Sequence, residues 1–394
     1  MARAMISLEE AQSRLLALVK PLPVVTLPLI DAAGSWAAED VVSKRTQPVR
    51  ALSAMDGYAV AAGGNSPWRV IGESAAGRPF AGKVGAGEAA RIFTGAALPG
   101  GTDTVIIQEN VTRDGDAISI EPEDAPRPNR HVRAEGSDFR AGDLLVKAGE
   151  RLNPARIALI AGGGHGSVAV HRRPRIALLA TGDELVPPGE DAGSDLLPES
   201  NTVMIAAMLR DFPCDVSILG IVPDDLDKLI AAIGSVEADL LVTLGGASVG
   251  DHDLVKPALE RCGASLDFWK VAMRPGKPVM AGKLGDMLVI GLPGNPVSAF
   301  VTTLLFTKPA AAALAGASDP LPRRKPMRLA AALPGNGSRA DHPRAKATIE
   351  GVMPVGSNDS AAMGGLAKAD LLIIRAPNAP PAAIGAEVMT LSIL

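Results

Sequence analysis

The sequence predicts a multidomain α/β plus β protein. Its centre is a doubly wound, mainly parallel α/β unit, joined to a β-rich insertion and a small C-terminal β-barrel-like unit. Three observations predict this fold class. The chain has 394 residues, which is too long for one ordinary core. From Arg175 onward, strand-like apolar runs alternate with helical patterns, which is typical of a parallel sheet covered on both faces. The first half holds short alternating runs between glycines and prolines, which indicates strands joined by tight turns.

The chain begins with a predicted amphipathic helix. Ser7 and Glu10 have the spacing of a capping box. The apolar residues that follow recur at helical spacing: Leu8, Ala11, Leu15, Leu18 and Val19. A second short helix is predicted after Asn153, its N-cap, with Pro154 at the first helical position. We assign residues 1–46 and 143–173 to an N-terminal helical and linking domain.

Residues 47–142 form the predicted β-rich insertion domain. The runs "DTVIIQENVT" and "DAISIEPED" alternate apolar and polar residues between turn signals, so antiparallel strands are expected here.

Residues 174–320 form the predicted α/β domain. Its strands are "RIALLA", "CDVSILGIV", "ADLLVTLGG" and "MLVIG", and its helices include "SNTVMIAAMLRDF" and "DDLDKLIAAIGS". The Pro- and Arg-rich break "DPLPRRKP" follows. Residues 321–394, with the runs "DLLIIRAP" and "EVMTLSIL", form a predicted C-terminal β domain.

Composition and charge exclude several classes of protein. The net charge of −4 argues against a general nucleic-acid binder, which would carry a basic stripe. No uninterrupted apolar stretch reaches the ~20 residues that a membrane span needs. The first residues include acidic side chains where a signal peptide would be apolar, so we expect a cytoplasmic protein. The two cysteines, Cys214 and Cys262, are expected to be small buried hydrophobes.

Glycine-rich segments follow three of the predicted strands, and ligands of such sheets bind at the carboxyl ends of the strands. The segments are "TGDEL", "GGASVGDHD" and "LPGNPVS". In the last one, Asn295 is a predicted N-cap and Pro296 the first helical residue, which would aim a helix N-terminus at an anion. Each segment alone is equally typical of a plain tight turn. Together they predict one anion-binding crevice lined by Gly245, Gly246, Ser248, Pro293, Gly294, Asn295, Pro296 and Ser298.

Carboxylates and basic residues accompany these strand ends. Glu184, Asp224 and Asp253 lie at or near them, and "MRPGKP" supplies Arg274 and Lys277. Such a set predicts Mg²⁺ held between carboxylates and substrate phosphates, and therefore phosphoryl or phosphoanhydride chemistry. The alternative is structural: the acids at positions 224 and 225 could simply begin a helix, and Lys277 could be an ordinary loop lysine.

The segment "SAMDGYAV" holds one carboxylate, Asp56, among small and apolar residues. An Asp-Gly pair is most often a turn, so Asp56 is either a turn residue or a ligand-site residue.

Seven motifs together resemble one family, the molybdopterin molybdenumtransferases (MoeA proteins), which are related to the C-terminal domain of gephyrin. In chain order they are "SAMDGYAV", "RIFTGAALPGGTDTVIIQE", "ATGDEL", "SNTVMIAAML", "GGASVGDHD", "MRPGKP" and "LPGNPVSAF". The resemblance implies the final step of molybdenum cofactor synthesis: molybdate is inserted into adenylylated molybdopterin, and Mg²⁺-assisted pyrophosphate cleavage releases AMP. It also implies that residues 174–320 are the molybdopterin-binding domain. The protein would be a four-domain homodimer, with each active site completed by the partner's second domain.

The resemblance also implies roles for individual residues. The catalytic set is Asp56, Thr94, Glu184, Asp224, Asp253 and Lys277, and the metal ligands are Glu184, Asp224 and Asp253. Arg133 and Asp138 join the crevice residues in binding the substrate. Arg274 stands where many family members have lysine; arginine can hold an oxyanion bidentately but cannot act as a neutral base.

Two other functions remain open at this stage. The chain could be a molybdopterin adenylyltransferase, but the β-rich insertion and "SAMDGYAV" favour insertion of the metal. It could be a non-catalytic gephyrin-like scaffold, but the acidic site residues favour an enzyme. An upstream adenylyltransferase and recipient molybdoenzymes are the expected protein partners.

Overall fold

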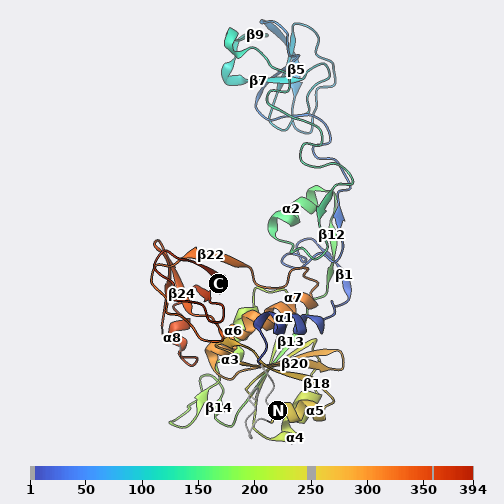
Figure 1. The fold of residues 1–394 in the computed structure, drawn as a ribbon. Helices are drawn as coiled ribbons and strands as arrows, with labels where there is room; N and C mark the ends of the chain where they lie inside the picture. Colours follow the sequence, from blue (N-terminus) through green and yellow to red (C-terminus); the bar gives the residue numbers. More distant parts are fainter. Residues whose placement is uncertain (1–4, 246–253, 357–358, 394) are drawn as a thin grey trace.

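The computed structural model describes residues 5–245, 254–356 and 359–393. Figure 1 shows an elongated molecule, with the β-rich unit at one end, a narrow connecting unit, and the α/β unit beside the C-terminal sheet at the other. The multidomain α/β plus β class predicted from the sequence is confirmed by this architecture.

The connecting unit is built from two-stranded pairs and one helix. β1 (Val24–Pro28) pairs antiparallel with β12 (Ser167–His171), and β2 (Val41–Val42) pairs with β11 (Leu144–Val146). Helix α2 (Pro154–Gly162) begins as predicted: Asn153 is its N-cap, and the side chain accepts a hydrogen bond from the N–H of Arg156.

The β-rich unit contains a six-stranded sheet of order β7-β4-β6-β5-β9-β8. Its pairs are antiparallel as expected, except that β5 and β6 run parallel. A separate short pair, β3 (Leu52–Ser53) with β10 (Val132–Arg133), flanks it. The remaining elements are β4 (Gly57–Val60), β5 (Trp68–Ser74), β6 (Glu88–Ile92), β7 (Thr104–Ile107), η1 (Gln108–Asn110), β8 (Thr112–Asp114), β9 (Ala117–Ser119) and η2 (Pro122–Asp124).

The α/β unit contains a six-stranded sheet of order β16-β13-β17-β21-β20-β18. β13 (Arg175–Thr181), β16 (Asp215–Val222), β17 (Leu240–Leu244) and β21 (Met287–Leu292) are parallel, whereas β20 (Pro278–Leu284) and β18 (Ser265–Lys270) add an antiparallel edge. Its helices are α3 (Asn201–Leu209), α4 (Leu226–Gly234), α5 (Val255–Arg261), α6 (Pro296–Thr302) and α7 (Lys308–Leu314). The short strands β14 (Leu185–Val186), β15 (Leu197–Pro198) and β19 (Met273–Arg274) lie between them.

The C-terminal unit is an antiparallel sheet of order β22-β27-β26-β24-β25. Its strands are β22 (Arg324–Arg328), β24 (Arg344–Thr348), β25 (Gly351–Pro354), β26 (Leu371–Ile374) and β27 (Glu387–Ser392), and α8 (Met363–Leu366) lies beside them. β23 (Ala340–Asp341) pairs in parallel with β19 and so ties this unit to the α/β unit.

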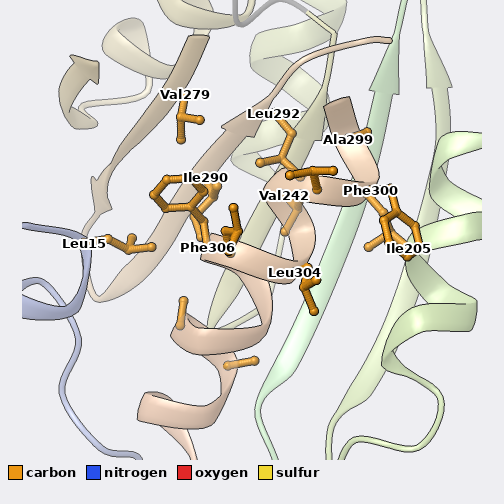
Figure 2. Close-up of a cluster of buried hydrophobic side chains, with 14 of the residues drawn as sticks. Leu15, Ile205, Val242, Val279, Ile290, Leu292, Ala299, Phe300, Leu304 and Phe306 are labelled. Carbon is orange, nitrogen blue, oxygen red and sulfur yellow. The ribbon is translucent and has the colours of Figure 1, made fainter. Parts of the chain in front are cut away.

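The main hydrophobic core lies on one face of the α/β sheet. Figure 2 shows Val242, Ile290 and Leu292 of the sheet meeting Phe300, Leu304 and Phe306 of the helical run that follows β21. This run, Pro296–Leu314, is long and apolar enough to cross a membrane by length and composition alone, but 89% of it is buried inside the protein. This helical run is therefore part of the hydrophobic core that covers the α/β sheet. The cysteines are partly buried, and burial raises the pKa of the Cys214 thiol to about 11, so it is not an activated nucleophile.

Helix α1 (Leu8–Ala17) packs against this same core, through Leu8, Ala11 and Leu15. The predicted capping box has one half formed: the Ser7 hydroxyl accepts from the N–H of Glu10 at 3.0 Å. The buried Gln12 donates its Nε2–H to the carbonyl of Leu305 at 2.9 Å. Because residue 309 is proline, that carbonyl has no α-helical N–H partner, and the helix there widens into the π-helical segment η3 (Thr303–Thr307).

Gln12→Leu is expected to lower the free energy of unfolding by about 1–3 kcal/mol, because it leaves a buried carbonyl without its side-chain donor. Chemical denaturation followed by circular dichroism measures the change. Ser13→Ala is the control, since Ser13 is exposed on the same helix. Equal denaturation midpoints for the two variants would show that the Gln12 hydrogen bond contributes nothing.

Candidate functional site

The carboxyl ends of the parallel strands come together at one edge of the α/β sheet, where the sequence predicts the anion-binding crevice. Thr181 ends β13 beside Val222, which ends β16. At Gly245, after β17, an added Cβ would lie 2.8 Å from the carbonyl oxygen of Thr181, and at Gly294, after β21, one would lie 3.7 Å from Cα of Gly245. The backbones of three strand ends therefore approach one another too closely for a side chain at Gly245, whose φ is +90°.

Three carboxylates follow two neighbouring parallel strands: Asp183 and Glu184 after β13, and Asp224 after β16. The hydroxyl of Thr181 donates to Oδ1 of Asp224 at 2.9 Å, and the N–H of Asp224 donates to Oδ1 of Asp183 at 3.0 Å. Glu184 follows β13 and is exposed. These contacts orient the Asp224 carboxylate at the end of the sheet while leaving it open to solvent.

The sequence left two roles open for the acids at positions 224 and 225, which were to begin a helix or to line the crevice. Asp225 is the N-cap of α4, and its carboxylate accepts from the N–H of Lys228 at 2.9 Å. Asp225 therefore caps α4. Asp224 lies at the strand end, where it accepts from Thr181.

The start of α6 differs from the prediction. Asn295 and Pro296 take the predicted N-cap and first helical positions, but the Asn295 side chain makes no capping hydrogen bond. The N–H of Val297 donates to the carbonyl of Ser360 in the C-terminal unit at 3.0 Å. One N–H that the sequence assigned to an anion is therefore already bound, because the C-terminal unit covers the helix end.

Asn201 is a crevice residue that the sequence analysis missed. Its Nδ2–H donates to the carbonyl of Gly294 at 2.6 Å, and its Oδ1 is buried without a hydrogen-bond partner in the described part of the chain. The buried Glu199 caps α3 instead of Ser200, since it accepts from the N–H groups of Asn201 and Thr202. The sequence signal for Asn201 was the Ser-Asn pair at the start of the predicted helix, and this pair indicated only a helix cap.

Arg274 ends the short strand β19 and Lys277 lies in the turn before β20, and both side chains are exposed. The Lys277 carbonyl accepts from the N–H of Val271 at 2.8 Å, which closes the turn. The Arg274 carbonyl accepts from the N–H of His342 at 2.9 Å. Burial lowers the pKa of His342 to about 4, so this imidazole is neutral near pH 7 and the basic charge here comes from Arg274 and Lys277.

The structure describes some of the remaining predicted crevice residues. Pro293 and Ser298 are buried beside the exposed Gly294. Gly246, Ser248 and Asp253 lie outside the described residues.

The β-rich unit places Asp56 and Thr94 together. Oδ1 of Asp56 accepts from the N–H of Thr94 at 2.7 Å and from its hydroxyl at 2.8 Å. These two bonds, the backbone one foremost, and the nearby Arg91 guanidinium hold the pKa of Asp56 below its ordinary value. The carboxylate is thus ionised near pH 7 and held in one orientation.

The glycine after Asp56 is required by a strand and not by a turn. Gly57 begins β4, between β6 and β7, and an added Cβ would lie 1.9 Å from the carbonyl oxygen of Ile106. The bend before it is fixed by the Ser53 hydroxyl, which donates to the carbonyl of Met55 at 2.5 Å. Arg133 pairs with Leu52 at the same end of the unit, and Asp138 is exposed nearby in sequence.

These two groups of residues lie in units that Figure 1 shows far apart. The sheet holding β5, β7 and β9 is at one end of the chain, the sheet holding β13 and β20 is at the other, and α2 and β12 lie between them. A single chain therefore holds Asp56 with Thr94 in one unit, and Glu184 and Asp224 in the other.

The donor set at the crevice fits Mg²⁺ bound through substrate. Among the residues that the structure describes, no group of three or more His, Cys, Asp or Glu side chains could hold a metal ion. Glu184 and Asp224 are two exposed carboxylates at adjacent strand ends. Mg²⁺ commonly takes one or two protein carboxylates and completes its shell with water and phosphate oxygens, so the two suffice without a dedicated protein cage.

Comparisons with known proteins agree with this architecture. Residues 6–164 match the MoeA N-terminal region (domain I and II), and residues 177–313 match a probable molybdopterin binding domain. A molybdopterin molybdenumtransferase of Haemophilus influenzae is 39% identical over 320 residues, covering 79% of this chain and 78% of the relative. One of Staphylococcus aureus is 31% identical over 383 residues, covering 94% and 91%. A crystal structure of the molybdopterin biosynthesis MoeA protein of Pyrococcus horikoshii superimposes with a TM-score of 0.82 at 25% identity, covering 98% of this chain and all of that one.

Proposed function

The chain belongs to the molybdopterin molybdenumtransferase (MoeA) family, and on that premise we propose that it inserts molybdate into adenylylated molybdopterin with release of AMP. It is a transferase of molybdenum cofactor biosynthesis. In the proposed reaction the two dithiolene thiols displace one oxygen of molybdate, which leaves with both thiol protons as water, and a water molecule cleaves the phosphoanhydride bond to release AMP. The observation that carries this proposal is the crevice where Gly245, Gly294 and the Asp224 carboxylate meet at the strand ends.

The crevice side chains take complementary roles in this proposal. Lys277 and Arg274 bind anionic oxygens of the substrate, and Arg274 can hold two at once. The backbone at Gly245 and Gly294 lets the ligand approach closely. Oδ1 of Asn201, which has no hydrogen-bond partner among the described residues, accepts a hydrogen bond from the substrate. Glu184 and Asp224, with Asp253, would hold Mg²⁺, which neutralises charge that develops on the phosphates.

The second group, Asp56 with Thr94, Arg133 and Asp138, is proposed to complete the site of a partner subunit. The separation of the two units along one chain supports this assignment. Asp56 is ionised and already oriented by Thr94, so it would reach the partner's site at little ordering cost.

A homodimer is supported by an exposed apolar strip on the α/β unit. β16 is an edge strand, on which Ile218 is 49% and Leu219 42% exposed, and Val203 on the neighbouring α3 is 51% exposed. An exposed apolar edge strand invites pairing unless it is covered. In the proposed homodimer, a second copy of the chain covers this strip. The expected location is the cytoplasm, with an adenylyltransferase as supplier and molybdoenzymes as recipients.

AMP release from adenylylated molybdopterin is expected to require molybdate and Mg²⁺ together. The test supplies the purified chain with this substrate, with and without molybdate, and measures AMP by chromatography. AMP released equally fast without molybdate would contradict the insertion step. Formation of adenylylated molybdopterin from molybdopterin and ATP would instead identify an adenylyltransferase.

A further inference from the structure

Arg91 lies near Asp56 in the β-rich unit, and the sequence predicted no role for it. It is the fourth residue of β6 and pairs across the sheet with Tyr58 of β4. Its guanidinium carbon lies 5.1 Å from the centre of the Tyr58 ring and 4.6 Å from the centre of the Phe93 ring. Both distances are within the range of cation–π contacts, so two aromatic rings support the guanidinium.

The Arg91 side chain connects three neighbouring strands. Its Nη1–H donates to the carbonyl of Gly57 at 2.8 Å, and its Nη2–H donates to Oε1 of Gln108 at 2.6 Å. Gly57 begins β4, and Gln108 directly follows β7. Because the strand order at this edge of the sheet is β7-β4-β6, one side chain from β6 crosses β4 and reaches the end of β7.

Asp56 is held at the ends of the same three strands. Its carbonyl accepts from the N–H of Gln108 at 3.1 Å, and its carboxylate accepts from the N–H and the hydroxyl of Thr94, two residues after β6. Arg91 therefore bonds both the residue that follows Asp56 and the residue that binds the Asp56 carbonyl. Removal of its guanidinium would loosen Asp56 on both of these sides.

No carboxylate holds Arg91 in place. Both of its acceptors are neutral, and among the residues that the structure describes it forms no ion pair. A guanidinium donates in diverging directions from one rigid plane and stacks on aromatic rings, whereas a lysine ammonium is a point charge on a flexible stem. An arginine at this position is therefore suited to connect strands rigidly.

We propose that Arg91 is a positioning residue for Asp56: its two hydrogen bonds fix Gly57 and Gln108, and through them the direction in which Asp56 presents its carboxylate to the partner's site. The inference rests on the function proposed above, in which Asp56 completes that site. In this role Arg91 acts through Asp56 and needs no contact with the substrate. A group that is oriented before the substrate arrives speeds the reaction, so the effect of Arg91 falls on the rate and not on substrate binding.

The first test measures molybdate-dependent AMP release by Arg91→Gln and Arg91→Lys. Arg91→Gln is expected to lower kcat about tenfold or more, because a small misplacement of a catalytic group is costly, and to leave KM unchanged. Arg91→Lys keeps the charge but lacks the rigid fork, so its kcat should be intermediate. Arg113→Gln is the matched control: Arg113 is an exposed arginine of the same sheet whose side chain also donates to a backbone carbonyl, at 2.8 Å. Its kcat should stay unchanged.

The second test needs no activity. Amide hydrogen exchange, followed by mass spectrometry of overlapping peptides, reports on the N–H groups of Thr94 and Gln108, which both donate to Asp56. In Arg91→Gln these two groups are expected to exchange about tenfold faster or more, since the variant loses charge-assisted hydrogen bonds. Unchanged protection of β5 and β9 shows that the unit is still folded.

Two results would overturn the inference. If Arg91→Gln lowered the melting temperature but kept the kcat of the folded protein, Arg91 would be a purely structural residue. If exchange at Thr94 and Gln108 stayed unchanged in Arg91→Gln, Asp56 would be fixed without Arg91. Failure of the proposed function has a different sign: the unmodified chain would release no AMP in response to molybdate, and the exchange experiment would still decide whether Arg91 positions Asp56.

Discussion

The Glu184→Gln variant is expected to release AMP about a hundredfold or more slowly than the unmodified chain, since charge neutralisation by a metal is worth several kcal/mol of barrier. Glutamine keeps the size of the side chain but removes the anionic oxygens that a divalent cation requires. Asp224→Asn should behave alike, because the Asp224 carboxylate lies at the adjacent strand end. The measurement is the initial rate of AMP release at saturating substrate, over a range of Mg²⁺ concentrations.

The control for this pair is Glu190→Gln, since Glu190 is an exposed carboxylate in the same connection after β13. It removes the same charge and should leave the rate unchanged. Full activity of Glu184→Gln, or full activity of the unmodified chain in excess EDTA, would remove the crevice carboxylates from the mechanism.

Two inactive variants, Asp56→Ala and Glu184→Ala, are expected to regain activity when they are unfolded together, mixed and refolded. In a two-fold dimer of composite sites, both defects of the heterodimer fall in one site, and the other site keeps every original group. Random mixing restores about a quarter of the sites. Both side chains are outside the apolar cores, so each variant alone should fold.

The matched control is a mixture of Glu184→Ala with Asp224→Ala. Both residues belong to the α/β unit, so every site in every mixed dimer still carries a defect and no activity should return. If Asp56 served only its own chain, the first mixture would stay as inactive as this control. Native mass spectrometry establishes that heterodimers form in both.

Local patterns predicted the caps of two helices, Ser7 and Asn153, because a cap is decided by residues within one turn. The sequence left open whether Asp224 or Asp225 begins a helix, and the predicted cap Asn295 makes no capping hydrogen bond. The convergence of Thr181, Gly245 and Gly294 was also predictable, since parallel strands of one sheet end at the same edge.

Contacts between distant segments could not be predicted. The carbonyl of Ser360 occupies the N–H of Val297, and Asn201 binds the carbonyl of Gly294. Both contacts depend on how the C-terminal unit and α3 pack over the crevice. The cavity that Arg274, Asp341 and Arg375 line was missed for the same reason, because these residues come together only through β-pairing of separate segments.

The bond from Gln12 to Leu305 also sets an order of events during synthesis. Its two residues are separated by 293 positions. At roughly 5–20 residues per second, the ribosome delivers the acceptor about 15–60 s after the donor. During that interval the apolar face of α1, which includes Leu8 and Leu15, cannot pack against the helical run that contains Leu305. The nascent chain therefore exposes this face until the last strand and helix of the α/β unit emerge, and it is during this interval that a chaperone has a segment to hold.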